Sequence, residues 1–369
     1  MRRFLIVACL GLGLVASGPA EAFPTTAGEV AVTLVAQGLE EPWALGFLPG
    51  GRYLVTERGG RLWLGDGADL APVEGTPPVV ARGQGGLLDI MVPRDFSQSR
   101  QVFLSYVTAQ RGGGAGTALA VARLSQDGRR LTGLRRLFEM RPGSRGGRHF
   151  GSRIVEAADG RIFLTIGDRA DRDLAQDPGR HNGSVIRLNR DGSVPADNPF
   201  VGQPGALPEI WSIGHRNPQG AALDEGGRLW ISEHGARGGD EINLVRRGAN
   251  YGWPVISYGR HYSGLPIGEG TAKDGMEQPA HYWDPSIAPS GMLIYSGRLW
   301  PEWRGDIFVG SLKFDRIERL SGAPDALQVA EVMQSPEMGR VRDLREAPDG
   351  SIWFLSVNEG AVFRMAPGD

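Results

Sequence analysis

The stretch "DGRIFLTIGD" at residues 159 to 168 places a glycine turn directly before a run of apolar and β-branched residues. Such a run after a turn is typical of a short, buried β-strand. The phrase occurs six times, at intervals of about 45 to 80 residues. The other copies are "GGRYLVTE" from Gly50, "RQVFLSYV" from Arg100, "GGRLWISEHG" from Gly226, "RGDIFVGSL" from Arg304 and "DGSIWFLSV" from Asp349.

Further strand-like runs follow several of these copies, among them "RLWLGD", "VIRLNRDG", "EINLVRRG", "RIERL" and "AVFRM". No long window shows the 3.6-residue period of an amphipathic helix. A short-strand unit that repeats six times predicts an all-β fold, a six-bladed β-propeller whose blades bury their faces against one another. We expect one propeller domain over residues 23–369; a pair of β-sandwiches is the alternative.

The N-terminus, "MRRFLIVACLGLGLVASGPAEAF", has two arginines, an apolar run and a small-x-small site that ends at Ala22. This order predicts a signal peptide over residues 1–22 and a periplasmic or secreted mature protein. The apolar run is too short to span a bilayer comfortably, and Cys9 stands too early for a lipoprotein signal. Because Cys9 is the only cysteine, the mature chain is expected to lack disulfides and thiolate metal ligands.

The chain of 369 residues has a formal net charge of −2, so no nucleic-acid partner is indicated. No segment after the N-terminus is apolar enough to be transmembrane, so no stable membrane insertion is expected. In a propeller, loops from different blades converge at one end of the central channel, so site residues should be scattered along the sequence. His149 lies in a glycine-rich loop, and Asp168 ends the strand that follows. A carboxylate there can orient the imidazole of a general base; a loop histidine bonded to the backbone is the plainer alternative.

Four cations occur at the ends of predicted strands in three different blades. Their convergence would form a pocket for a small polyanion, with arginine able to bind a carboxylate in a bidentate manner. Arg340 and Arg342 alternate along one strand and therefore face the same side. If the strands do not converge, each is an ordinary surface cation. The four residues are Arg216, Lys313, Arg340 and Arg342.

A series of motifs resembles the soluble PQQ-dependent sugar dehydrogenases, in the aldose sugar dehydrogenase branch. The motifs run in family order from about Gly38 to Met365. They are "GQGGLLDI" at 83–90, "HFGSRI" at 149–154, "LTIGDR" at 164–169, "IWSIGHRNPQG" at 210–220, "SEHGARGGDEINLVRRGANYGWP" at 232–254, "SIAPSGM" at 286–292, "GSLKFDRI" at 310–317 and "RVRDLREAPDG" at 340–350.

The resemblance implies an enzyme that oxidises the anomeric C1 hydroxyl of an aldose to the aldonolactone by hydride transfer to pyrroloquinoline quinone (PQQ), beside calcium. It implies that His149 is the general base and that Asp168 orients it. In such an enzyme the cofactor carries the redox chemistry, and the protein supplies its position and the electrostatic field around it. The cofactor-binding residues implied are Gln84, Arg216, Asn217, Lys313, Arg340, Arg342 and Trp283.

The stretch "ISEHGARGGDEINLVRRGANYGWP" at 231–254 gathers acids around His234 and looks at first like a side-chain metal site. The resemblance instead implies that the main-chain carbonyls of Gly235 and Ala236 hold the calcium beside the cofactor. Glu241 and Tyr251 match two positions of a second, largely main-chain calcium site. His234 is then expected to be a structural neighbour.

Other features limit what the resemblance implies. Arg148 stands where the glucose dehydrogenase branch has an acidic residue before the base. The implied partners are an aldose and an electron acceptor such as a periplasmic cytochrome or the quinone pool, for a monomer or a homodimer. Two other functions stay open: a calcium-dependent propeller lactonase or hydrolase, which would not need four cations in its channel, and a non-catalytic sugar- or protein-binding propeller.

Overall fold

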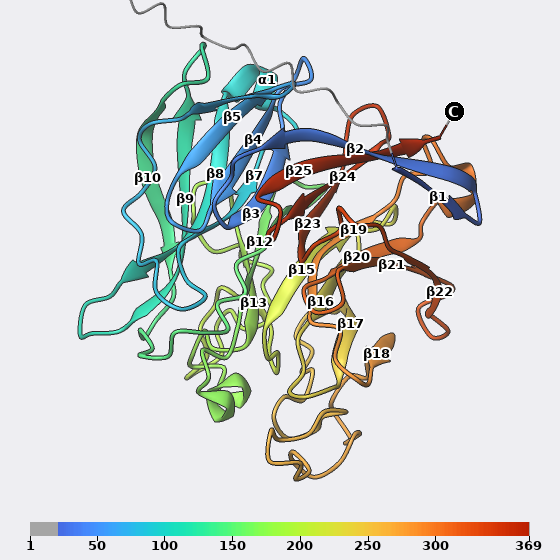
Figure 1. The fold of residues 1–369 in the computed structure, drawn as a ribbon. Coiled ribbons are helices and arrows are strands. Elements are labelled where there is room, and N and C mark those ends of the chain that lie inside the picture. The colour runs from blue at the N-terminus through green and yellow to red at the C-terminus, as the bar shows by residue number, and fades with distance from the viewer. Residues whose placement is uncertain (1–20, 369) are drawn as a thin grey trace, which may run out of the picture.

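The structure, a computed structural model, describes residues 21–368, and its strands form six antiparallel sheets arranged in a ring (Figure 1). The predicted six-bladed β-propeller is confirmed. From the channel outward, blade one consists of β3 (Pro42–Phe47), β4 (Tyr53–Glu57), β5 (Leu62–Asp66) and β6 (Asp69–Pro72). Blade two consists of β7 (Leu87–Met91), β8 (Gln101–Ala109), β9 (Ala115–Leu124) and β10 (Leu131–Glu139). Blade three consists of β11 (Ile154–Glu156), β12 (Ile162–Ile166), β13 (Ser184–Leu188) and β14 (Ile210–Ser212).

Blades four to six complete the ring, and the inner strand of each blade contacts those of its two neighbours. Blade four consists of β15 (Pro218–Leu223), β16 (Leu229–Glu233), β17 (Asp240–Val245) and β18 (His281–Trp283). Blade five consists of β19 (Pro289–Ile294), β20 (Ile307–Ser311), β21 (Arg316–Ser321) and β22 (Gln328–Met333). Blade six consists of β23 (Val341–Glu346), β24 (Ile352–Ser356), β25 (Ala361–Pro367), β2 (Gly28–Gln37) and β1 (Glu21–Thr25).

The repeated phrase marks the same strand in every blade. Its six copies form β4, β8, β12, β16, β20 and β24, the second strand counted from the channel. Residues along these strands are buried on both faces, since a blade packs against a neighbour on each side, and they therefore read as continuous apolar runs. The runs that follow them form the third strands, such as β5 and β13.

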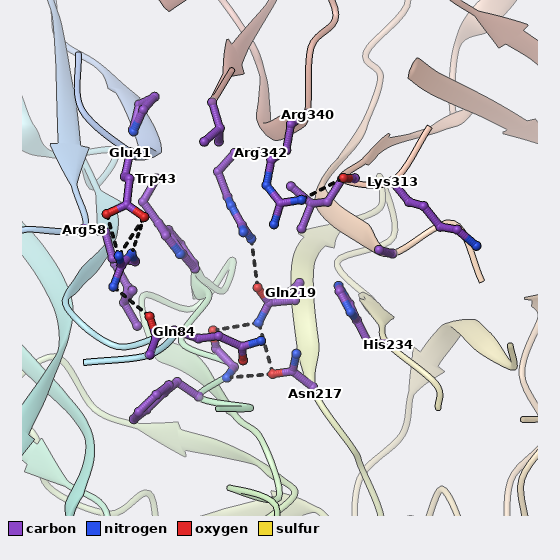
Figure 2. Close-up of a pocket in the computed structure, with 18 residues that line it drawn as sticks. Glu41, Trp43, Arg58, Gln84, Asn217, Gln219, His234, Lys313, Arg340 and Arg342 are labelled. Carbon is purple, nitrogen blue, oxygen red and sulfur yellow. Dashed lines mark hydrogen bonds and ion pairs between the residues drawn. The ribbon is translucent and has the colours of Figure 1, made fainter. Parts of the chain in front are cut away.

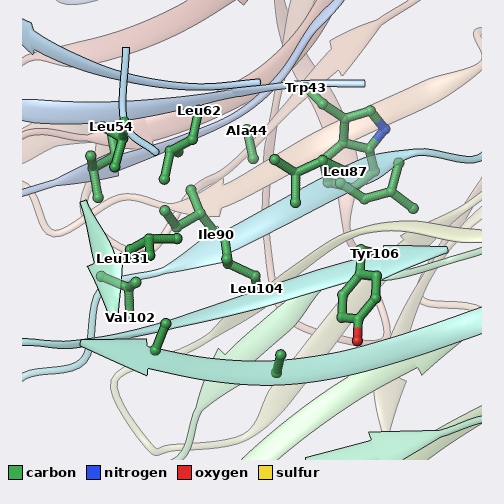
Figure 3. Packing of buried hydrophobic residues seen from close by; sticks show 14 of the residues in the cluster. Trp43, Ala44, Leu54, Leu62, Leu87, Ile90, Val102, Leu104, Tyr106 and Leu131 are labelled. Atoms are coloured by element: carbon green, nitrogen blue, oxygen red, sulfur yellow. The ribbon is translucent and has the colours of Figure 1, made fainter. Parts of the chain in front are cut away.

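Six hydrophobic clusters hold the ring together, one at each boundary between neighbouring blades. Figure 3 shows the cluster between blades one and two, where Trp43 and Leu54 face Leu87 and Leu104. Each blade therefore buries its apolar surface only when both neighbours are in place.

Both ends of the described chain lie in blade six. β2, near the N-terminus, pairs with the C-terminal β25, and this pairing closes the ring. The predicted signal peptide, including Cys9, lies almost wholly outside the described residues; its expected cleavage point after Ala22 falls within β1.

Helical structure in residues 21–368 is limited to single turns, α1 (Phe96–Ser99), η1 (Arg172–Gln176) and η2 (Pro301–Trp303). No helix of this part of the chain has the length and apolar character needed to span a membrane.

Candidate active site

A cavity of about 550 Å³ lies at the centre of the ring, and every blade contributes to its wall (Figure 2). Loops that enter or leave the inner two strands carry most of the lining side chains. In order from blade one to blade six, the wall includes Trp43, Gln84, Gly151, Asn217, Lys313 and Arg342.

His149 and Asp168 come together beside this cavity, in the loops that flank β11 and β12. His149 Nδ1 lies 2.6 Å from Asp168 Oδ1. The Asp168 carboxylate is buried, and its second oxygen accepts a hydrogen bond from Trp253 Nε1 at 2.8 Å. A fixed carboxylate at Nδ1 holds the proton on that nitrogen, so Nε2 keeps its lone pair and can accept a proton.

The imidazole of His149 is neutral at physiological pH. Burial lowers its pKa below the ordinary 6.5, and the hydrogen bond to Asp168 opposes that shift. The nearby guanidinium groups of Arg216 and Arg148 lower the pKa further. A neutral, oriented imidazole has the protonation state that a general base requires.

Cations dominate the charged lining of the cavity. Arg58, Lys313, Arg340 and Arg342 line it, whereas Glu41 is its one lining carboxylate. Glu41 is already paired with Arg58 through both oxygens. The remaining positive charge therefore favours an anionic ligand in the cavity.

Within residues 21–368, the side-chain hydrogen bonds of three of the predicted cations go to neutral oxygens. Lys313 Nζ donates to the Ser286 carbonyl at 3.1 Å, and Arg340 Nη1 donates to the Leu312 carbonyl at 2.9 Å. Arg342 Nη1 donates to Gln219 Oε1 at 3.1 Å (Figure 2). Such bonds leave the formal charges uncompensated.

Desolvation lowers the pKa of Arg342 to about 9, and the guanidinium groups of Arg153 and Arg340 add to this effect. A bound anion would relieve this repulsion.

The two predicted amides belong to a hydrogen-bonded network along the wall. Gln84 Oε1 accepts a bond from the main-chain N–H of His149 at 2.8 Å. Asn217 Oδ1 accepts from the main-chain N–H of Gly151 at 3.3 Å and from Gln219 Nε2 at 3.1 Å. The network couples the loop that bears His149 to the cavity wall.

Arg216 lies beside the cavity rather than in its lining. Its guanidinium is buried over the Trp253 ring, and its Nη1 donates to the carbonyls of His234 and Gly235. Its Nε is buried without a hydrogen-bond partner within residues 21–368. An additional acceptor in this position would satisfy the buried Nε–H donor of Arg216.

The predicted metal loop turns between β16 and β17. The Gly235 carbonyl accepts from Arg216, and the Ala236 carbonyl accepts from the main-chain N–H of Arg260 at 2.9 Å. Asp240 braces the turn, because its Oδ1 accepts from Gly235 N at 2.8 Å. A Cβ at position 235 would lie 2.2 Å from two carbonyl oxygens, so the turn requires glycine there.

Glu241 and Tyr251 are not among the cavity residues. The Glu241 carboxylate accepts from Asn243 Nδ2, and burial together with Glu233 raises its pKa to about 8. Tyr251 donates its hydroxyl to the Leu244 carbonyl at 2.6 Å. Within residues 21–368, no group of three or more His, Cys, Asp or Glu side chains has metal-binding geometry.

The structure does not bring Trp283 to the cavity. Its indole is buried between blades four and five and donates to Glu318 Oε2 at 2.8 Å. The aromatic residues of the wall are Trp43 and Phe150 instead, and the sequence reasoning missed both of them, together with Arg58. Trp43 follows the proline of "EPWALGF" on an inner strand. Only the register of that strand decides the direction in which the Trp43 side chain points.

His234 also lines the cavity, although the sequence reasoning ranked it as a structural neighbour. Its Nε2 donates to the Pro289 carbonyl at 2.7 Å, so Nδ1 is the unprotonated nitrogen. Burial lowers the pKa of His234 to about 3, with Arg216 and Arg342 adding to the effect. It presents a neutral hydrogen-bond acceptor among the cations.

Two arginines and two aspartates join across the channel next to the cavity. Arg153 contacts Asp343 at 2.9 Å and Asp89 at 3.3 Å, and Arg345 contacts the same two carboxylates. Arg153 also lies over the Trp43 ring at 4.2 Å. These buried ion pairs support the cavity wall from the channel side.

The chain is similar in sequence and in fold to known proteins. Residues 39–364 match the family described as Glucose / Sorbosone dehydrogenase. Aldose sugar dehydrogenase YliI of Escherichia coli (strain K12) is 41% identical over 345 residues, 92% of this chain and 93% of the relative. The apo crystal structure of the soluble aldose sugar dehydrogenase from Escherichia coli superposes with a TM-score of 0.88, at 40% identity over 92% of this chain and 100% of the other.

A third relative was solved with a ligand. The PQQ-bound form of aldose sugar dehydrogenase from Streptomyces coelicolor superposes with a TM-score of 0.77, at 27% identity over 95% of this chain and 99% of that one.

Proposed function

The chain belongs to the glucose/sorbosone dehydrogenase family, and on that premise we propose that it is a PQQ-dependent aldose dehydrogenase. Its reaction oxidises the anomeric C1 hydroxyl of an aldose to the aldonolactone. The observation that carries the proposal is the oriented His149–Asp168 pair beside a cavity lined by four cations. Relatives described as an aldose sugar dehydrogenase and as its PQQ-bound form support it.

The residues present fit a flat tricarboxylate. Within residues 21–368, the side chains of Lys313, Arg340 and Arg342 have no carboxylate partner in their hydrogen bonds, and Arg216 has a buried Nε without a partner. These side chains would hold the carboxylates and quinone oxygens, with Gln84 and Asn217 adding hydrogen bonds. When bound, PQQ supplies the acceptor for the hydride from C1.

The protein moves the proton. His149 Nε2 takes the proton of the C1 hydroxyl, which converts the imidazole to imidazolium while the C1 hydride and its electron pair leave the sugar. Asp168 stabilises that cation through Nδ1. The surrounding guanidinium and ammonium groups stabilise negative charge that develops at the acceptor. An external electron acceptor then completes the cycle.

The proposal is tested by adding PQQ and calcium to the purified chain and following dye reduction with several aldoses. We expect turnover that requires both an aldose and PQQ. Hydrolysis of lactones without PQQ would support a hydrolase instead. Binding of sugars without any PQQ-dependent turnover would support a non-catalytic propeller.

Calcium is proposed to bind at the carbonyls of Gly235 and Ala236, because calcium prefers oxygen ligands, main-chain carbonyls among them. A cation at Gly235 O requires Arg216 to leave that oxygen, and an anionic ligand offers the guanidinium another partner. Chelator-treated protein is expected to lose PQQ-dependent turnover and to regain it with Ca²⁺. Full activity after chelation, with calcium absence verified by elemental analysis, would contradict this site.

The pH dependence of kcat/KM should report the titration of His149. The pKa of His149 is lowered from 6.5, and a protonated base cannot accept a proton, so the acid limb should lie below pH 6.5. Asp168→Asn removes a hydrogen bond that raises this pKa, so the limb should move to lower pH while the plateau falls. An upward shift in the variant would contradict the assignment.

A further inference from the structure

The loop that carries His149 is held by a buried arginine, Arg169, that the mechanism has not used. Arg169 Nη2 donates to the Gly146 carbonyl at 2.5 Å, and Nη1 donates to the Arg148 carbonyl. Its main-chain N–H donates to the carbonyl of His149 at 3.3 Å. Its guanidinium lies over the ring of Phe150, 3.2 Å from the centroid. Arg169 therefore contacts the residues before His149, His149 itself and the residue after it.

Arg169 is an unusual choice for a purely structural position. Its side chain is fully buried, yet both terminal nitrogens bind carbonyl oxygens rather than a carboxylate. Desolvation lowers its pKa to about 9. Burying a guanidinium without an ion pair is unfavourable, and an apolar side chain over Phe150 would fill the space without that cost. An apolar residue, however, would lack the two terminal nitrogen donors that bind the loop carbonyls.

The two facing loops are also conformationally strained. His149 has φ 56°, Ser152 has φ 88°, Arg169 has φ 60° and Ala170 has φ 65°. Each is a non-glycine residue in the left-handed region, which persists only where surrounding contacts enforce it. The His149 loop therefore needs an external support to keep its shape.

The His149 loop is also closely fitted to the loop of Gln84. Gln84 N donates to the Gly147 carbonyl at 2.8 Å, and Gln84 Oε1 accepts from His149 N at 2.8 Å. A Cβ on Gly83 would lie 2.1 Å from the Gly147 carbonyl oxygen. The His149 loop is thus held by contacts with both Gln84 and Arg169.

We propose that Arg169 is a positioning residue, a guanidinium clamp that holds the His149 loop so that Nδ1 stays against Asp168 and Nε2 faces the sugar. The inference rests on the proposed role of His149 as general base. It assigns Arg169 no contact with sugar or cofactor. Its effect should appear in the rate and in the state of His149, rather than in cofactor affinity.

Arg169→Met removes both donors but keeps an apolar side chain over Phe150. We expect kcat to fall by roughly tenfold to 100-fold, the range that follows from small misplacement of a reacting group. The Kd for PQQ, measured by titration, should stay unchanged. Arg169→Lys keeps the charge and one donor, so its kcat should lie between those of Arg169→Met and the parent protein.

A second readout does not depend on the loaded enzyme. The Nδ1–H proton of His149, bonded to Asp168, should give a downfield NMR signal in the cofactor-free protein, assigned by its absence in His149→Gln. The signal should be lost in Arg169→Met. The matched control is Arg187→Met, because Arg187 is likewise buried and lies over an indole, Trp211, at 4.7 Å. This control should keep both the signal and kcat of the folded protein.

The outcomes separate the two proposals. Parental kcat together with an intact His149 signal in Arg169→Met would overturn the clamp. If Arg169→Met does not fold, the same two observations in Arg169→Lys decide: values equal to those of the parent protein overturn the clamp, and a kcat below that of the parent with a weakened signal supports it. If the parent protein shows no PQQ-dependent turnover, the proposed function fails, and the NMR comparison still tests the clamp.

Discussion

Replacing His149 by alanine is expected to lower kcat for aldose oxidation by about 100-fold to 10,000-fold, the usual contribution of a positioned general base. His149 Nδ1 is held by Asp168 at 2.6 Å, and its lowered pKa keeps it neutral. The cofactor should still bind, because the cations that hold it are on other loops. Steady-state kinetics and PQQ titration on the same preparation measure both quantities.

The matched control for this experiment is His281→Ala. His281 lies in β18 outside the cavity lining, and its Nδ1 donates to the Leu327 carbonyl at 3.2 Å. Its removal should leave kcat unchanged. A His149→Ala protein that binds PQQ and turns over at the parental rate would show that another group is the base.

Replacing Arg342 by methionine is expected to weaken PQQ binding by about tenfold to 150-fold, which corresponds to loss of one hydrogen bond to a charged group, about 1.5–3 kcal/mol. Arg342 faces the cavity beside Trp43, and its present partner is the neutral amide of Gln219. It is therefore available to an anion, and methionine preserves much of its volume. Fluorescence titration of the cofactor-free protein with PQQ gives the two Kd values.

A surface arginine provides the comparison for Arg342. Arg304 is exposed and paired with Glu225 at 2.7 Å, so Arg304→Met changes the net charge equally without reaching the cavity. It should leave the Kd for PQQ unchanged. Equal weakening by both variants would mean that only the overall field matters, and an unchanged Kd in Arg342→Met would remove Arg342 from the cofactor site.

The repeat predicted the propeller because it marks strands whose environment is directly visible in the sequence. The second strands, such as β12 and β20, are buried on both faces and read as apolar runs. Some of the inner strands carry no such signal. β15, "PQGAAL", and β23, "VRDLRE", include buried polar and charged residues that face the channel, so their sequences resemble loops.

The candidate site was predictable where a residue directly follows a recognisable strand or belongs to a long family motif. Asp168 after β12 and His149 in its glycine-rich loop are of this kind, and the structure brings them together. Trp283 and Trp43 are the opposite case. Which of two aromatic residues faces the channel depends on strand register and on the neighbouring blade, and neither is written in the local sequence.

The most direct test of the account is a single-turnover experiment without an electron acceptor. The chain loaded with PQQ and calcium is mixed anaerobically with an aldose, and the absorbance of the bound cofactor is followed by stopped flow. The account predicts conversion of the oxidised spectrum at a rate that rises to saturation with sugar concentration and collapses in His149→Ala. A bound cofactor whose spectrum does not change with any aldose would contradict it.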